Sequence, residues 1–211
     1  MNPQTLSTLS LLNDLRHSAT ETLERKHKYP ALLLFYSFID ICASLAEEPP
    51  SKSNGERFKS YLSQYALLSW ALFRPYDLWA ARSSLLHAYS PLGDHTKTPN
   101  GAVPLFYFAW PETESEVQKY LVSRGYTNFV LIDANTIKHI AVSAFNSMWA
   151  RVETDAAFEA VLLKNATHIL KDLFQYRLEE ELVFLEQQVS GKDRTQGNAA
   201  TDSQPQNRSS K

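Results

Sequence analysis

The chain has 211 residues, of which 44% are apolar, so it can bury a sizeable core and form one domain with or without an appendage. Its formal net charge of −2 argues against the broad basic face of a protein that coats DNA, so any nucleic-acid contact must be local. The single cysteine, Cys42, excludes an intramolecular disulfide and favours a reducing, cytoplasmic environment. Because Cys42 lies in an apolar run, we expect a small core residue rather than a nucleophile.

The hydrophobic pattern predicts a mainly α fold, a helical bundle with a small two-stranded β insertion at about 100–133. In the helical segments, apolar residues recur at spacings of three and four, and Pro or Gly marks most of the ends. In chain order, helices are expected at about 6–28, 30–46, 56–72, 76–89, 112–124, 133–151 and 155–189. Strands are expected within 103–110 and 128–133, where they pair with each other.

The domain organisation follows from a change of composition near residue 190. Residues 1–189 are expected to form one helical domain that includes the insertion. Residues 190–211 are rich in polar and small residues and contain no aromatic residue, so we expect a disordered tail. The N-terminal segment lacks the basic and apolar regions of a signal peptide.

The fourth predicted helix carries the string Arg82-Ser-Ser-Leu-Leu-His87-Ala-Tyr89, which has the form R-x4-H-x-Y. It combines a permanent cation, an imidazole and a phenol, a set suited to chemistry on a phosphate ester. Arg82 can donate two hydrogen bonds to phosphate oxygens and stabilise charge that builds in a transition state. His87 can take the 2′-hydroxyl proton of RNA or protonate the leaving 5′-oxygen, without any metal or other cofactor. The structural alternative is that Arg82 reaches solvent and His87 caps the end of its helix.

Helical geometry bears on whether this string forms a site by itself. Residues five apart on a helix differ by about 140° and residues seven apart by about 20°, so Arg82 and Tyr89 share a stripe from which His87 diverges. Two such helices facing each other across a two-fold axis would place two Arg and two His around one cleft. The spacing therefore favours a homodimeric site. His139 and His168 lie on helices without a second ligand at i+4, so no zinc site is predicted.

The second predicted helix is apolar nearly all round, which places it at the centre of the core. Ser37, Asp40 and Ser44 form a polar stripe on it, and a carboxylate there is unfavourable unless a cation pairs with it. Arg82 is the best-motivated partner of Asp40. The alternatives are another basic residue, Arg57 or Arg74, or hydroxyl hydrogen bonds. The polar stripe also leads us to expect that this run, residues 31–45, is too short and too polar to span a bilayer.

Together these residues resemble the HEPN superfamily of small helical bundles. Arg82 and His87 match its R-x4-6-H motif near the end of a core helix. Tyr89 matches the extended form of toxin members, in which the tyrosine can be nucleotidylated by a partner antitoxin. The segment LLLFYSFIDICASL, which contains Asp40, also resembles uncharacterised bacterial HEPN-like proteins.

This resemblance implies a metal-independent endoribonuclease that acts as a homodimer, in a toxin–antitoxin or defence context, with RNA as substrate. Arg82 and His87 would be catalytic, and Asp40, Ser83 and Tyr89 would support them. Active members often carry Asn, Asp or His directly after the Arg, where this chain has Ser83. The main alternative is therefore a non-catalytic HEPN-like module that binds RNA, a nucleotide or a partner protein. A purely structural helical dimer is the third.

Overall fold

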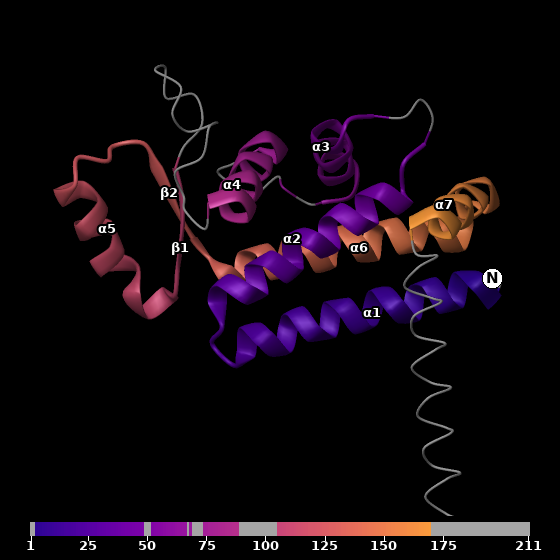
Figure 1. Cartoon of the computed structure of the whole chain (residues 1–211), viewed down its shortest axis with the longest axis horizontal. Coiled ribbons are helices and arrows are strands. Elements are labelled where there is room, and N and C mark those ends of the chain that lie inside the picture. The colour runs from indigo at the N-terminus through magenta and orange to yellow at the C-terminus, as the bar shows by residue number, and fades with distance from the viewer. Residues whose placement is uncertain (1–2, 49–51, 67, 69–73, 89–104, 170–211) are drawn as a thin grey trace, which may run out of the picture. The chain divides into compact units, whose positions relative to one another are not determined.

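The computed structural model describes residues 3–48, 52–66, 68, 74–88 and 105–169. Within these ranges the protein is mainly α-helical, as the sequence predicts, with seven α-helices and two short strands. The helices are α1 (Pro3–Glu24), α2 (Lys28–Leu45), α3 (Asn54–Tyr65), α4 (Pro75–Ala88), α5 (Glu114–Ser123), α6 (Ala134–Thr154) and α7 (Ala156–Ile169). The strands are β1 (Leu105–Ala109) and β2 (Phe129–Asp133), and a 3-10 turn, η1 (Pro111–Thr113), precedes α5 (Figure 1).

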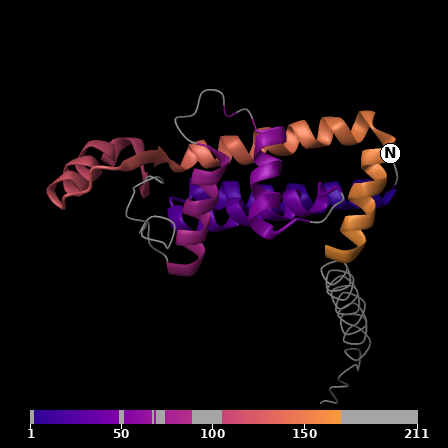
Figure 2. The ribbon, with the colours of Figure 1, turned by 90° about the horizontal axis from the view of Figure 1, so that it is seen from above.

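The central helix of the described bundle is α2, as its apolar sequence predicts. It contacts α1, α3, α4, α6 and α7. Figures 1 and 2 show that the axes of α1, α2 and α6 are roughly aligned, while α3, α4 and α7 lie across them. Half of the residues of α2 are buried: Ala31, Leu32, Phe35, Tyr36, Phe38, Ile39, Cys42, Ala43 and Leu45. The expectation that Cys42 is a core residue is confirmed, since its exposed fraction is 0%.

The turn between α1 and α2 differs from its prediction. We expected the first helix to continue to about residue 28 and to break at Tyr29-Pro30, but α1 ends at Glu24 and α2 already begins at Lys28. The chain reverses at Lys26, whose φ of 65° lies in the left-handed region. Pro30 falls within the first turn of α2, where its missing N–H removes no helical hydrogen bond.

Helix α3 begins with a capping box. Ser53 Oγ accepts a hydrogen bond from Glu56 N, and Glu56 Oε2 accepts one from Ser53 N at 3.1 Å. The helix ends at Tyr65 because Ala66 adopts an extended conformation, so the expected continuation to residue 72 is wrong. The shorter helix leaves a connection to α4, much of which lies outside the described residues.

The β insertion has the expected strands, which pair in parallel from Leu105 opposite Phe129 to Ala109 opposite Asp133. Helix α5 connects them, as parallel strands require a crossover. Gly125, with a φ of 81°, follows the end of α5. Asp133 ends β2 and also caps α6, because its side chain accepts a hydrogen bond from Asn135 N at 2.9 Å.

The last helix is described as far as Ile169. The predicted continuation to residue 189 and the predicted tail 190–211 lie outside the described residues, as does Tyr89.

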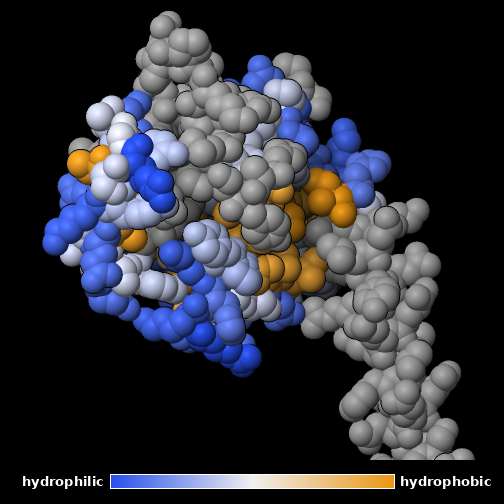
Figure 3. Space-filling model, turned by 60° about the vertical axis from the view of Figure 1, so that its left-hand side comes forward, coloured by the Kyte–Doolittle hydropathy of each residue, from blue (hydrophilic) through white to orange (hydrophobic). Residues whose placement is uncertain are grey.

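By length and composition, α2 meets the criterion for a membrane-spanning helix. It has 18 residues with a mean hydropathy of 1.3, so the expectation that this run is too short is wrong for the helix as it forms. Half of this window is buried inside the protein, and the core helix of a soluble protein passes the same test. On the face shown in Figure 3, apolar residues gather near the centre, and hydrophilic residues occupy most of the rest of the described surface.

Candidate functional site

Asp40 on α2 and Arg82 on α4 form an ion pair. Nε and Nη2 of Arg82 donate hydrogen bonds to the same carboxylate oxygen, Oδ2, at 2.9 and 2.6 Å. The two side chains retain exposed fractions of 18% for Arg82 and 27% for Asp40, so the pair lies at the edge of the core. The expectation that Asp40 pairs with Arg82 is confirmed.

The two alternative partners of Asp40 are engaged elsewhere. Arg57 Nη1 lies 2.7 Å from Glu47 Oε2, and Arg74 Nη2 lies 3.2 Å from Asp77 Oδ1. The serines of the polar stripe do not bind the Asp40 carboxylate in the described structure. Ser44 Oγ donates to the backbone carbonyl of Asp40 at 2.8 Å, and Ser37 is exposed.

The start of α4 sets which residues face the core. Pro75 occupies the first turn, and Asp77 Oδ2 accepts a hydrogen bond from Arg74 N at 2.7 Å, which satisfies one N–H at the helix start. One face of the helix is buried in the protein: Asp77, Leu78, Ala80, Ala81, Ser84 and Leu85. Arg82 lies beside this face, so its long side chain can reach Asp40 while it keeps contact with solvent.

Trp79 holds the guanidinium of Arg82 from another side. The Cζ atom of Arg82 lies 4.8 Å from the centroid of the Trp79 ring, within the range of a cation–π contact. The indole packs on Phe58 of α3, with ring centroids 5.4 Å apart. A Cβ atom added at Gly55 would lie 3.0 Å from Cε2 of Trp79, so a larger residue here would require the indole to move by a few tenths of an ångström. Asp40 and Trp79 therefore both contact the guanidinium of Arg82 and restrict its orientation.

Burial dominates the electrostatics of Asp40. Removal from water raises the pKa of this carboxyl above its ordinary value of 3.8, and the hydrogen bond and charge of Arg82, together with the charge of Arg57, only partly oppose the rise. The ionised carboxylate is therefore less favourable here than it is in water, even with Arg82 beside it. Within the described part of the chain, Nη1 of Arg82 donates to no protein group, which leaves one edge of the guanidinium able to bind an anion.

The other predicted site residues are only partly placed. Ser83 is half-buried on α4, directly after Arg82. The backbone of His87 belongs to the last turn of α4, but its side chain lies outside the described part of the structure, as does the whole of Tyr89. The convergence of Arg82 and His87 therefore stays a prediction.

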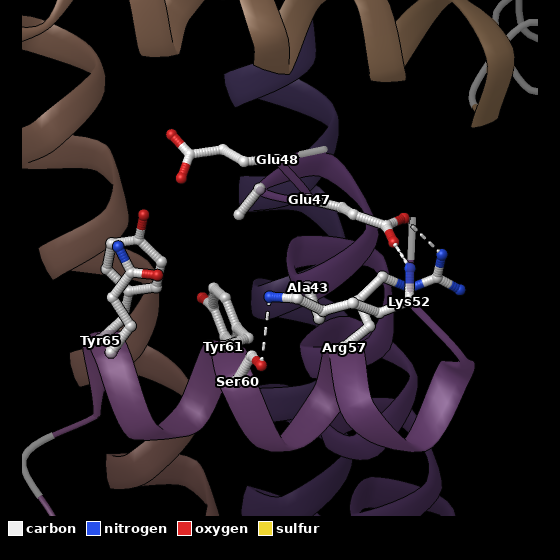
Figure 4. Close-up of a pocket in the computed structure, with 10 residues that line it drawn as sticks. Ala43, Glu47, Glu48, Lys52, Arg57, Ser60, Tyr61 and Tyr65 are labelled. Atoms are coloured by element: carbon white, nitrogen blue, oxygen red, sulfur yellow. Dashed lines mark hydrogen bonds and ion pairs between the residues drawn. The ribbon is translucent and has the colours of Figure 1, made fainter. Parts of the chain in front are cut away.

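A second polar cluster joins the end of α2 to α3 and α6. Glu47 faces Arg57, and Lys52 Nζ donates to Ser60 Oγ at 3.3 Å (Figure 4). Arg151 of α6 binds Glu48 at 2.7 Å and Tyr65 Oη at 3.0 Å. No sequence pattern predicted this cluster. In the sequence, the feature that corresponds to this cluster is the acidic pair that follows α2, together with arginines on other helices.

The pocket beside this cluster is too small for a nucleotide. Its volume is about 30 Å³, which is room for one or two water molecules, whereas pockets for small organic ligands measure about 300–1,000 Å³. Among the residues that the structure describes, no group of three or more His, Cys, Asp or Glu side chains is placed to hold a metal ion. The cluster is therefore best explained as a structural connection between helices.

Comparison of the chain with protein-family models, with curated proteins and with solved structures found no match. We therefore infer the function from the geometry around Arg82.

Proposed function

We propose that this chain is a HEPN-type, metal-independent endoribonuclease that acts as a homodimer in the cytoplasm, in a toxin–antitoxin or defence context. The observation that supports this proposal is the ion pair between Arg82 and Asp40, which orients a guanidinium on the helix that also carries His87. A fixed guanidinium is what stabilisation of a phosphoryl transition state requires, because the donors need no rearrangement during the reaction.

The proposed reaction uses one base and one acid. An imidazole of His87 removes the proton of a 2′-hydroxyl group, and the 2′-oxygen attacks the adjacent phosphorus. Nη1 of Arg82 stabilises the negative charge on the non-bridging oxygens. The bond from phosphorus to the 5′-oxygen breaks, and an imidazolium, supplied by His87 of a second subunit, protonates the leaving oxygen. The products are a 2′,3′-cyclic phosphate and a 5′-hydroxyl group.

In this scheme the other predicted residues have supporting roles. Asp40 positions Arg82, Ser83 offers a hydroxyl beside it, and Tyr89 is a candidate for modification by a partner antitoxin. No cofactor takes part.

A second candidate, a non-catalytic HEPN-like module that binds RNA, a nucleotide or a partner protein, is favoured by one observation. Asp40 compensates the charge of Arg82 and occupies two of its nitrogens, while Trp79 covers the guanidinium. An arginine held in this way also contributes to packing, and its remaining donors suffice for binding without turnover.

The test is cleavage of a mixed RNA pool in EDTA by the wild-type protein, His87→Ala and Arg82→Lys. His139→Ala is the matched control, because His139 is an exposed histidine on α6. We expect the wild type and His139→Ala to cut RNA to 2′,3′-cyclic phosphate ends, and the other two variants to lose at least about 100-fold in rate.

Folding of each variant is checked by circular dichroism. Cleavage that His87→Ala retains would contradict the mechanism. RNA binding by folded wild-type protein without any cleavage would contradict the ribonuclease and select the binding module.

A further inference from the structure

The central helix α2 has one face that the rest of the protein leaves open. Ser37 in the middle of this face is exposed, and Leu33, Ile41 and Ser44 around it are half-buried. Successive residues of a helix are 100° apart, so these four lie within about 80° of one another. Phe35, on the opposite side of α2, is 0% exposed. In Figure 1, α1 lies below α2, α3 and α4 lie above it, and no described helix crosses in front of it.

The open face belongs to the most apolar helix of the described bundle and is itself uncharged. The mean hydropathy of α2 is 1.3, yet only half of its 18 residues are buried within one copy of the chain. Between Tyr29 and Leu45 the only charged residue is Asp40, and its carboxylate is paired with Arg82 of the same copy. Apolar helix surface left in water is unfavourable and marks a site of contact with another molecule.

The composition of this face fits a second copy of the same chain. In a two-fold interface a surface meets itself, so a residue near the axis faces its own counterpart. An unpaired charge there would face a like charge, and the stripe from Leu33 to Ser44 carries none. Ser37 stands four residues after Leu33 and four before Ile41, and its small side chain lets a second helix approach closely at the middle of the stripe.

We infer that α2 of one copy packs across α2 of a second copy, with Ser37 at the crossing point. The inference rests on the proposed function for its homodimer and adds the surface through which that homodimer forms. Asp40 lies three residues after Ser37, about 4.5 Å along the helix axis, at the edge of the open face. The Asp40–Arg82 pairs of the two copies therefore flank the same crossing, on the side of the bundle where α4 carries His87.

The first experiment measures the mass of the full chain in solution by sedimentation velocity, at protein concentrations up to about 100 µM. The variant is Ser37→Arg, which places an unpaired cation at the crossing point and, by symmetry, a second cation opposite it. Ser147→Arg is the matched control, because Ser147 is an exposed serine in the interior of another helix, α6. Circular dichroism checks the folding of each protein.

We expect the wild type and Ser147→Arg to form dimers with equal Kd values. Ser37→Arg should raise the Kd of the dimer at least about 100-fold, because two like charges would have to be buried together. A wild type that stays monomeric over the whole range would overturn the interface, as would a Ser37→Arg protein that dimerises like the control.

A second variant keeps the test decisive if Ser37→Arg does not fold. Ser37→Cys adds one small thiol to a chain whose single native cysteine, Cys42, is buried. A disulfide needs Cα atoms within about 7 Å, so only residues close to the axis can be cross-linked to their own counterpart. Mild oxidation should convert Ser37→Cys, but not Ser147→Cys, to a covalent dimer. Equal cross-linking of the two variants would overturn the interface.

The outcomes separate this inference from the proposed function. A wild type that dimerises through Ser37 and cuts no RNA supports the interface and contradicts only the ribonuclease. RNA cleavage by a protein whose dimer does not respond to Ser37→Arg supports the ribonuclease and overturns only the interface. A monomeric wild type that floats with vesicles of phosphatidylcholine and phosphatidylglycerol would assign the open face of α2 to a membrane and overturn the interface.

Discussion

Asp40 and Arg82 are 42 positions apart in the chain, yet two nitrogens of the arginine share one oxygen of the aspartate. The pair connects the central helix α2 to α4, which carries the R-x4-H string. The geometry of this pair favours a role in holding Arg82, but its burial is unfavourable for the charge of Asp40. The geometry fixes the guanidinium, whereas burial raises the pKa of Asp40 despite the neighbouring cation.

Substitution of Asp40 should therefore separate stability from function. Because burial disfavours the charge of Asp40, we expect Asp40→Asn to leave the free energy of unfolding at pH 7 unchanged within about 1 kcal/mol, or to raise it. Asp40→Ala removes the acceptor of two hydrogen bonds and should lower it by about 1–2 kcal/mol. In RNA cleavage, Asp40→Asn should still lose up to about 100-fold in rate, because a neutral amide holds the guanidinium of Arg82 less firmly than a carboxylate does.

The pH dependence of stability, compared between the wild type and Asp40→Asn, tests whether folding raises the pKa of Asp40. A folded-state pKa above 3.8 means that the folded protein binds this proton more tightly than the unfolded chain does. Relative to Asp40→Asn, the wild type should lose stability as pH rises from 3.8 through the raised pKa. Urea unfolding of both proteins between pH 3.5 and 8 measures the difference. A wild type that gains stability over this range would show that the attraction of Arg82 outweighs burial.

A substitution at Gly55 should have opposite effects in two backgrounds. Alanine normally stabilises a helix relative to glycine by up to about 1 kcal/mol. In the wild type its methyl group would meet the Trp79 indole at 3.0 Å, so Gly55→Ala should lower the free energy of unfolding by about 1 kcal/mol. In a Trp79→Ala background the same change should raise it by about 0.5–1 kcal/mol. Urea unfolding of the four proteins measures both effects.

The same four proteins test the link to Arg82. If the indole positions the guanidinium, Gly55→Ala should reduce RNA cleavage by the otherwise wild-type protein even when it remains folded. A stabilising effect of Gly55→Ala in both backgrounds would mean that the Trp79 indole does not pack closely against Gly55. It would contradict the role that we assign to this glycine.

Cys42 should be chemically inert in the folded protein. Burial raises the pKa of its thiol to about 12. Alkylation by iodoacetamide at pH 8 should then require unfolding and run more than about 10³-fold slower than in 6 M guanidinium chloride, given a typical stability of at least 5 kcal/mol. Because the chain has one cysteine, the mass shift of the intact protein reports this residue alone. Rapid alkylation under native conditions would contradict the placement of Cys42 in the core.

Local pattern predicted most of the helices well because the signal is carried by neighbouring residues. The apolar run around Phe35 and Phe38 indicated the central helix, and β-branched and aromatic residues indicated both strands. The boundaries were weaker. The end of α1 depends on the left-handed conformation of Lys26, and no glycine or proline stands at this position to predict it. Helix α3 ends at Tyr65, where the sequence has no glycine or proline either.

The site was only partly predictable, for a different reason. A carboxylate on an apolar helix requires a cationic partner. Three arginines were candidates for pairing with Asp40, and the sequence allowed us to rank them but not to choose one with certainty. Contacts such as Gly55 with Trp79 or Glu48 with Arg151 depend on which helices are adjacent and on the rotamers that packing selects. Neither carries a sequence signature of its own.

By itself, the sequence determined that this chain is mainly helical, that α2 lies at the core and that Asp40 needs a cationic partner, because each follows from burial of apolar surface and the unfavourable burial of charge. Only the tertiary structure decided that Arg82 is that partner, that Arg57 and Arg74 belong to other carboxylates, and that Trp79 covers the guanidinium. These choices depend on distances between residues remote in the chain, which are set by how α2, α3 and α4 pack together.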